Sequence, residues 1–314
     1  MNPRLALADA EPVPYWLSQP GAPEPAQPLR RKEWADLAVI GGGFTGLWTA
    51  LIAKERDPTR EVVLLEAEAV GWAASGRNGG FCSASLTHGR ANGRARFPEE
   101  LSELDKLGRA NLDEIEATVR RYGIDCGFER TGELNVATQP WQLAGLADLD
   151  DEVLDQEAVR AQVNSPTYLG GVWDRDGCAM VDPARLAWGL REASLRLGVR
   201  VYEHTPVQRI VRVGDRLTLH TPLSTVDANR VALATGAHGR LLRRLGAYVV
   251  PVYDYVLMTE PLTPAQLAEI GWANRQGIGD TANQFHYYRL TDDHRILWGG
   301  YDAVYFPGGR IRPD

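Results

Sequence analysis

The fold of this 314-residue chain is decided by four consecutive stretches: DLAVI (36–40), GGGFTG (41–46), LWTALIAKER (47–56) and EVVLLE (61–66). The two apolar runs predict buried strands, and the segment between them predicts a helix. A strand, a glycine turn, a helix and a second strand form a βαβ unit. The stretch therefore predicts an α/β fold that begins with a Rossmann-type unit.

The glycine turn matches the dinucleotide pattern GxGxxG through Gly41, Gly43 and Gly46. The first glycine permits a tight turn, the second lets the backbone approach a pyrophosphate, and the third lets helix and strand pack closely. The helix N-terminus offers N–H groups and a partial positive charge to the phosphates. Glu66 ends the second strand about 20 residues further on, where a carboxylate accepts a hydrogen bond from a ribose hydroxyl. The alternative is a glycine-rich turn beside a surface glutamate.

A second loop rich in glycine and serine follows Glu66, with the sequence AEAVGWAASGRNGGF (67–81). A simple NAD-binding domain does not need this loop, whereas FAD lying along the protein requires backbone close to it. Ser75 and the N–H groups of residues 76–80 are expected to contact the pyrophosphate and the flavin. Arg77 either neutralises phosphate or forms a structural ion pair. The predicted FAD contacts here are Gly41, Gly43, Phe44, Thr45, Gly46, Glu66, Ser75, Arg77, Asn78 and Gly79.

The remaining chain alternates helix and strand patterns. Seven prolines mark residues 1–33 as an extended arm, whose Tyr15 and Trp16 either dock on the protein or belong to a loose tail. Apolar periodicity predicts a helix over 99–121 and another over 183–197, which Asp182 caps and Gly198 ends. Strands are predicted at 132–138, 199–203, 207–213, 216–221 and from 230, and β alternation resumes after Val249 in 249–260, 284–291 and 295–301.

Composition excludes several classes of protein. The net charge of −7 and the pI near 5.5 disfavour binding to a nucleic-acid backbone. The three cysteines form no CxxC pair, which disfavours a zinc site and fits small buried side chains in a reducing cytoplasm. The uncharged run 37–53 is too short and too rich in glycine for a membrane span. The sequence leaves the oligomeric state open.

Together these motifs resemble the FAD-dependent oxidoreductases of the D-amino-acid oxidase type, most of all the γ-glutamylputrescine oxidase-like enzymes. The resemblance implies a doubly wound FAD-binding domain (34–95 and 181–247) interleaved with an antiparallel-sheet substrate domain (96–180 and 248–314). The stretches that carry it are VIGGGFTGLWTALIAKERDP (39–58), VVLLEAEAVGWAASGRNGGF (62–81), MVDPARLAWGLREAS (180–194), TPVQRI (205–210) and ALATGAHG (232–239).

The same resemblance assigns three further cofactor contacts. Val207 would touch the adenine through its backbone, and Thr235 and Gly236 would lie near the pyrophosphate. By themselves these residues belong to an ordinary strand and an ordinary turn. Members of this family usually continue past this length, so we expect an N-terminal fragment that lacks the last strand of the FAD domain and a glycine-rich turn over the flavin.

The resemblance implies oxidation of an amine or amino-acid C–N bond, for which the flavin is the electron sink. The sequence contains no GxSxG or HExxH motif, its six histidines lack ligand spacing, and we assign no catalytic residue and no metal. Tyr255, His286, Tyr287 and Arg289 are substrate candidates on the late strands. Aromatic rings there either enclose a protonated amine or pack in the core.

Three of these candidates have simpler alternatives. Of Tyr287 and its neighbour Tyr288, only one can face the substrate, because successive strand residues point to opposite faces. His286 is either a site residue or a strand histidine with a local partner. Arg289 either binds a substrate carboxylate or pairs with Asp292 or Asp293.

Two other functions compete with a flavoenzyme that acts on a small amine or amino acid. An NAD-linked dehydrogenase would explain GxGxxG and Glu66, but neither the loop ASGRNGGF (74–81) nor the late turn ATGA (234–237). A truncated, non-enzymatic fragment that binds flavin poorly is the other alternative.

Overall fold

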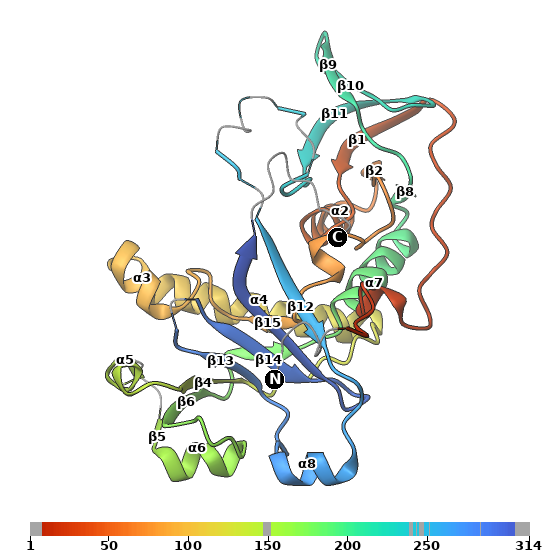
Figure 1. Cartoon of the computed structure of the whole chain (residues 1–314). Helices are drawn as coiled ribbons and strands as arrows, with labels where there is room; N and C mark the ends of the chain where they lie inside the picture. The colour runs from red at the N-terminus through yellow and green to blue at the C-terminus, as the bar shows by residue number, and fades with distance from the viewer. Residues whose placement is uncertain are drawn as a thin grey trace. The chain divides into compact units, whose positions relative to one another are not determined.

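The structure, a computed structural model, describes residues 8–146, 152–238, 241–242, 244, 248–250, 252–282 and 284–304, the last four by their backbone alone. The chain forms two compact units, and each unit is assembled from two separate segments. The first unit combines Met1–Arg77 with Leu190–Ala234, and the second combines Asn78–Gly189 with Thr235–Asp314. Figure 1 shows how the chain passes from one unit to the other and back.

A six-stranded sheet forms the centre of the first unit, in the order β8-β2-β1-β11-β10-β9. Strands β8, β2, β1 and β11 run parallel, and β10 and β9 are antiparallel additions at one edge. Ile40 at the end of β1 pairs with Leu65 on one side and Leu233 on the other, so three strands end together. The strands are β1 (Glu33–Ile40), β2 (Val62–Leu65), β8 (Arg200–Tyr202), β9 (Arg209–Val213), β10 (Arg216–His220) and β11 (Thr225–Leu233).

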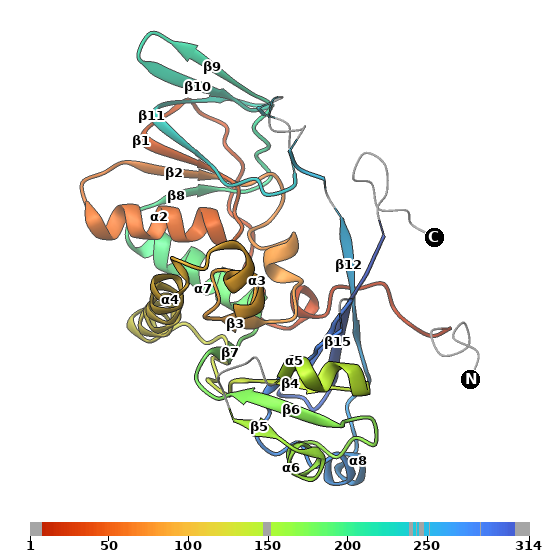
Figure 2. The same ribbon diagram turned by 90° about the vertical axis from the view of Figure 1, so that its left-hand side faces the viewer.

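Helix α2 (Phe44–Arg56) follows β1 and lies along this sheet, as Figure 2 shows. Its Leu47 and Leu51 are fully buried, as are all four residues of β2. Helix α7 (Pro183–Arg196) begins as expected, because Asp182 Oδ1 accepts the backbone N–H of Arg185 at 3.0 Å. Gly198 follows with φ +89°, the left-handed conformation that ends a helix.

The N-terminal arm is docked from residue 15 onward, so of the two alternatives for Tyr15 and Trp16 docking is right and the loose tail is wrong. The short helix η1 (Trp16–Ser18) buries Trp16, whose ring meets that of Tyr15 edge-on. Leu29 is also buried, at 1% exposure. Prolines fix an extended path without preventing docking, and here the side chains of Trp16 and Leu29 are buried against the protein.

A seven-stranded sheet organises the second unit, in the order β12-β15-β14-β13-β4-β6-β5. Every neighbouring pair is antiparallel except β13 and β4. A separate two-stranded ribbon pairs β3 with β7. The strands are β3 (Phe81–Ser83), β4 (Glu133–Ala137), β5 (Val153–Leu154), β6 (Gly170–Asp174), β7 (Cys178–Met180), β12 (Tyr253–Met258), β13 (Gly277–Asp280), β14 (His286–Leu290) and β15 (Ile296–Val304).

One face of this sheet carries the core of the second unit. Leu134, Ile278 and Tyr288 are buried there. Val159 of α6 (Gln156–Gln162) and side chains of α8 (Pro264–Ile270) pack against them. The long helix α4 ends at Gly123, which has φ +62°. The helices that lie wholly in this unit are α3 (Arg90–Arg96), α4 (Leu101–Tyr122), η3 (Pro140–Gln142), α5 (Leu143–Leu146), α6 (Gln156–Gln162) and α8 (Pro264–Ile270). The short helix η2 (Ala74–Gly76) belongs to the first unit. No helix among the described residues is long and apolar enough to cross a membrane.

The predicted elements all occur, with small shifts at their ends. The sequence missed the short strands β3, β5, β6, β7 and β13, because they are two to five residues long or rich in glycine. β11 begins at Thr225, five residues before its predicted start. The domain limits 34–95, 181–247, 96–180 and 248–314 stay predictions, because they refer to cofactor and substrate contacts and not to compactness.

Candidate functional site

The glycine turn after β1 has the close packing that its sequence predicts. Gly41 has φ +112°, and a Cβ at Gly46 would lie only 1.9 Å from the Gly41 carbonyl oxygen. A Cβ at Gly43 would lie 2.9 Å from Ser75 Oγ, which accepts the N–H of Phe44 at 3.0 Å. Each glycine of the motif is therefore required by backbone conformation or by a close neighbour.

Glu66 is buried at the end of β2 and joins the turn to the loop that follows. One carboxylate oxygen accepts the N–H of Gly42, and the other accepts the N–H of Glu68 at 2.9 Å and the indole N–H of Trp72 at 3.0 Å. A carboxylate has about four acceptor positions, so three donors leave one for a ribose hydroxyl. Its predicted cofactor role stays a prediction that this geometry permits.

Residues 66–77, here called the cofactor loop, are fixed at several points. Gly71 N–H donates to the Gly42 carbonyl at 3.1 Å, and Val70 N–H donates to Glu203 Oε1 at 2.6 Å. Arg77 is exposed, donates to the Trp72 carbonyl and lies 5.5 Å from the centre of the Trp72 ring. Arg77 thus makes a hydrogen bond to a carbonyl and a cation–π contact with an indole ring. Among the described residues no carboxylate pairs with it, as the ion-pair alternative would require.

These features fit an FAD diphosphate and ribose. The N-terminus of α2 presents N–H groups, the preceding residues Gly41, Gly42 and Gly43 carry no side chains, and Thr45 lies in the first helical turn. Anions bind at such helix ends because the N–H groups and the helix dipole both favour negative charge. Glu66 supplies a carboxylate at the adjacent strand end, where the pattern requires one.

The residues assigned by resemblance alone lie beside the same strand ends. Thr205 N–H donates to the Glu66 carbonyl at 2.8 Å, and the half-buried Val207 follows two residues later. Ala234 N–H donates to the Ile40 carbonyl at 2.8 Å, directly before Thr235 and Gly236, which has φ +55°. The proposed contacts of Val207, Thr235 and Gly236 with FAD stay predictions.

In the second unit the glycine segment after Arg77 packs against β14. Asn78 Oδ1 accepts the N–H of Gly80 at 2.9 Å. A Cβ at Gly79 would lie 2.6 Å from the Tyr287 ring, and one at Gly80 would lie 2.6 Å from an Arg289 nitrogen. The structure thus brings predicted cofactor residues, Asn78 and Gly79, together with two predicted substrate residues, Tyr287 and Arg289.

Arg289 is buried and bound to backbone. Its Nη1 donates to the carbonyl oxygens of Val181 at 2.7 Å and Gly80 at 3.2 Å. Burial lowers the pKa of the guanidinium to about 10. The turn carboxylates pair with other cations, Asp292 with Arg275 and Asp293 with Arg295. The expected pairing within the turn is therefore replaced by hydrogen bonds that fix the glycine segment.

The four substrate candidates divide between the two faces of the sheet. Tyr255 pairs with Gly300 and Gly300 with His286, so these two side chains share one face. Tyr287 is opposite Gly299 and lies on the other face, where its hydroxyl donates to Asp254 at 2.9 Å. The four candidates are therefore not gathered in one place.

On the sheet face that carries Tyr255 and His286, the side chains of His286 and Tyr288 have partners within the protein. His286 Nδ1 lies 2.8 Å from Asp280 Oδ2, the local partner that the sequence allowed for. Tyr288 is buried, stacks on Trp298 with ring centroids 4.4 Å apart, and shares a hydrogen bond of 2.7 Å with the Tyr168 hydroxyl. Of the adjacent tyrosines, Tyr287 remains the candidate for contact with a ligand.

Glu133 is a residue that sequence reasoning missed. It lies on the Tyr287 face, because Asn135 pairs with Gly279, Gly279 pairs with Tyr287, and Glu133 precedes Asn135 by two residues. The side chain is half-buried, and no described residue donates a hydrogen bond to its carboxyl. Desolvation by burial, with a contribution from Asp174, raises the pKa of Glu133 to about 7.

A strand glycine, Gly279, lies beside this carboxyl. A Cβ at Gly279 would lie 3.2 Å from Glu133 Oε1 and 3.3 Å from Asn135 Oδ1, so two acceptor oxygens approach the strand where no side chain intervenes. Gly299 likewise leaves room for the Tyr287 ring, since a Cβ there would lie 2.2 Å from it. The sequence signal was a single charged residue in the predicted strand GELNVA (132–137).

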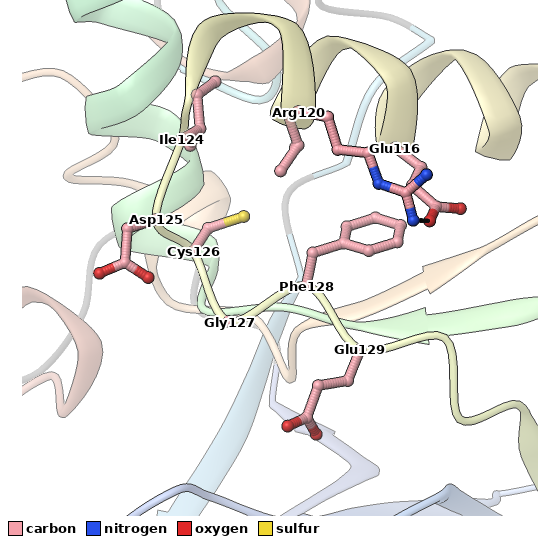
Figure 3. A pocket seen from close by; sticks show the side chains of 9 residues that line it. Glu116, Arg120, Ile124, Asp125, Cys126, Gly127, Phe128 and Glu129 are labelled. Carbon is pink, nitrogen blue, oxygen red and sulfur yellow. Dashed lines mark hydrogen bonds and ion pairs between the residues drawn. The ribbon is translucent and has the colours of Figure 1, made fainter.

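A pocket of about 360 Å³ lies elsewhere in this unit, at the end of α4 (Figure 3). Two of its carboxylates have cationic partners: Glu116 pairs with Arg120 and Arg130, and Glu129 with Arg275. The residues that line it are Glu116, Val119, Arg120, Ile124, Asp125, Cys126, Gly127, Phe128 and Glu129. Since none of these is a predicted site residue, the pocket is separate from the candidate site.

Within the described parts of the chain, no three potential ligands gather as a metal site.

Comparison with known proteins supplies the context for these residues. The model of the family described as FAD dependent oxidoreductase (DAO) matches residues 36–314. Gamma-glutamylputrescine oxidoreductase of Escherichia coli (strain K12) is 31% identical over 301 residues, which cover 91% of this chain and 69% of that protein. The probable oxidoreductase OrdL of Haemophilus influenzae is 28% identical, with 87% of this chain and 66% of that protein covered. The chain thus spans about two thirds of the length of these relatives.

Solved structures share the fold. Glycine oxidase from Geobacillus kaustophilus superposes with a TM-score of 0.69 at 20% identity, which covers 90% of this chain and 75% of that one. L-proline dehydrogenase from P. horikoshii gives a TM-score of 0.68 at 17% identity, which covers 90% and 72%. These likenesses confirm the predicted fold class, a Rossmann-type unit interleaved with a sheet-based unit.

Proposed function

Because the chain belongs to the FAD-dependent oxidoreductase (DAO) family, we propose that it oxidises the C–N bond of an amine or amino acid to the imine. The observation that carries this proposal is the family match, which includes the glycine turn, Glu66 and the cofactor loop. The match confirms the predicted family, enzyme class and FAD cofactor, and it favours these over an NAD-linked dehydrogenase. The activity of this chain itself remains a proposal.

Two of the relatives carry the substrate class in their names. The protein from Escherichia coli is named for gamma-glutamylputrescine, and one from Bacillus subtilis, 27% identical over 227 residues, is named glycine oxidase. Both names refer to a molecule with an amino group. An amine or amino acid is therefore the substrate class that we propose, without a choice within that class.

The chain's own residues would bind and orient the reactants. FAD, when bound, would accept the two electrons that are released when the α C–H bond breaks and the C–N bond becomes the C=N bond of the imine, and would pass them on to oxygen or a carrier. The N-terminus of α2 would hold the diphosphate, Glu66 a ribose hydroxyl, and Val207, Thr235 and Gly236 the positions that the resemblance assigns. Arg289 keeps the Asn78–Gly80 segment in place through its carbonyl bonds.

The sheet face of the second unit favours a cationic ligand. Glu133 and Asp254 supply carboxyl groups, Asn135 supplies an amide oxygen, and Tyr287 supplies an aromatic ring. An ammonium group donates hydrogen bonds and is attracted to carboxylates and to aromatic faces. We propose that an amine binds on this face with Glu133 as one of its acceptors.

The decisive measurement is flavin reduction under anaerobic conditions. The reconstituted protein is mixed with polyamines, γ-glutamyl amines, glycine or N-methyl amino acids, with 2-hydroxy acids and NADH as matched controls. We expect loss of the oxidised flavin absorbance with at least one amine and with neither control. Reduction by hydroxy acids alone would contradict the amine assignment.

Two broader expectations remain proposals. The partner is a small molecule and not nucleic acid, in keeping with the acidic composition. A cytoplasmic location is proposed from the cysteines, of which Cys126 and Cys178 are buried and Cys82 is half-buried. The expectation that all three are buried is therefore met by two of them.

A further inference from the structure

Within the N-terminal arm, residues 15–29 contact the segments that hold the cofactor loop. The first contact is a buried carboxylate, Glu203, at the end of β8. Its Oε2 accepts the N–H of Ala26 at 2.6 Å and the Nε of Arg191 at 3.0 Å. Its Oε1 accepts the N–H of Val70 in the cofactor loop at 2.6 Å. One carboxylate therefore joins the arm, the loop and α7.

The arm itself adds a second partner to this junction. Arg191, at 5% exposure, bonds Glu203 and also donates from Nη2 to the Glu24 carbonyl of the arm at 3.0 Å. Apolar residues of similar volume can replace buried ion pairs without loss of stability, so this pair is not explained by stability alone. Its distinguishing property is that it fixes two backbone segments relative to each other.

A separate contact is made by Leu17 of the arm with the turn that carries Ser75. A Cβ at Gly76 would lie 2.8 Å from Leu17 Cδ2 and 2.2 Å from the Gly71 carbonyl oxygen. The turn η2 is thus enclosed between Leu17 of the arm and the cofactor loop. Ser75 in this turn accepts the N–H of Phe44, the first residue of α2, so displacement of the turn would alter the helix end that is proposed to bind phosphate.

A third contact leads to Glu66, the carboxylate proposed to bind the ribose. Leu29 N–H donates to Thr205 Oγ1 at 3.1 Å, and Thr205 N–H donates to the Glu66 carbonyl at 2.8 Å. The arm therefore meets the cofactor loop near its start through Thr205, at its middle through Glu203 and at its end through Leu17.

We propose that Glu203 and Leu17 are positioning residues through which the docked arm holds residues 66–77 in the conformation that binds FAD. Docking of the arm and binding of FAD are then coupled, and each strengthens the other by the same factor. The inference rests on the proposed function only in taking the cofactor loop as an FAD contact.

The test compares FAD affinity of the apoproteins of wild type, Leu17→Ala, Leu17→Met and Glu203→Gln. Val13→Ala is the matched control, because Val13 is 55% exposed on the same segment of chain. We expect Leu17→Ala and Glu203→Gln to weaken FAD binding by about fivefold or more, the lower end of typical coupling between sites. Leu17→Met should restore the affinity, and Val13→Ala should leave it unchanged.

Hydrogen exchange provides a readout that a merely structural arm would not change. In wild type, saturation with FAD should slow exchange of the amides of residues 15–29, and the slowing should shrink in Leu17→Ala. Unchanged FAD affinity in both variants, or equal exchange of the arm with and without FAD, would overturn the proposal.

The same experiment separates this inference from the proposed function. Coupling between the arm and FAD in a protein that no amine reduces would leave the inference standing and contradict amine oxidation. A wild-type protein that does not bind FAD at all would overturn both.

Discussion

Two buried glutamates and one half-buried glutamate differ in what surrounds their carboxyl groups. Glu66 and Glu203 in the first unit each accept at least three hydrogen bonds, from backbone, indole or guanidinium donors. Glu133 in the second unit accepts none from the described residues, and its pKa is raised to about 7. A carboxylate supplied with donors fixes the chain around it, whereas one without donors is suited to a ligand that brings its own.

The largest expected effect comes from the turn that supplies a donor to Glu66. Gly43→Val should abolish FAD binding, because its Cβ would lie 2.9 Å from Ser75 Oγ and its side chain would project toward the phosphates. Titration of the apoprotein with FAD measures this. Gly145→Val is the matched control, since a Cβ at Gly145 meets nothing within 4 Å. Equal affinity in the two variants would show that the turn does not bind the diphosphate.

The next effect concerns the carboxylate that has its own donors. Glu66→Ala should weaken FAD binding by about 1–3 kcal/mol, the scale of a hydrogen bond to a charged group. It should also lower the melting temperature of the apoprotein, since Gly42, Glu68 and Trp72 would lose their acceptor. Glu157→Ala, on the exposed surface of α6, is the control for both measurements. A lower melting temperature with unchanged FAD affinity would restrict Glu66 to a structural role.

The first unit could largely be predicted from sequence because its signals are local. The turn at 41–46, the strand that ends at Glu66 and the cap at Asp182 each depend on residues within a few positions of one another. The docked arm could not be predicted, because Ala26 meets Glu203 across 177 positions of sequence. Nothing near either residue indicates that contact.

The second unit was harder to predict because its site depends on register between distant strands. Glu133 and Tyr287 are placed on one sheet face only by the pairing of their strands with β13. The sequence GIGD (277–280) of that strand resembles a turn. Registers of this kind also placed Tyr255 and His286 on the opposite face from Tyr287. The alternation within QFHYYR correctly separated Tyr287 from Tyr288, since that rule needs only neighbouring residues.

A smaller effect is expected when the carboxyl without donors is made neutral. Glu133→Gln should raise KM for a cationic amine by about tenfold, corresponding to ~1.4 kcal/mol, with little change in kcat. In wild type, KM should fall as pH rises through about 7, because Glu133 ionises while an amine with a pKa near 10 stays protonated. The variant should lack this dependence. Glu157→Gln, on the exposed surface of α6, is the control, and a KM profile shared by all three proteins would exclude Glu133 from amine binding.

The smallest effect concerns stability, and its sign follows from linkage. The pKa of Glu133 rises from 4.5 toward about 7 on folding, so the folded protein binds this proton more tightly than the unfolded chain. The stability that this proton contributes is fully present below pH 4.5 and is lost as pH rises through about 7. Glu133→Gln cannot lose it, so the melting temperature of the variant apoprotein relative to wild type should increase between pH 5 and pH 8.

This increase should be about 2–4 °C, the shift produced by roughly 1 kcal/mol in a domain of this size. The full pKa shift would correspond to more, but partial contact of the side chain with solvent screens the effect. Glu66→Gln offers the contrast, because it replaces a carboxylate whose donors are part of the fold, and it should lower the melting temperature at pH 8. If both variants are destabilised equally at pH 8, then Glu133 has donors of its own and does not differ from Glu66 in the way that its surroundings indicate.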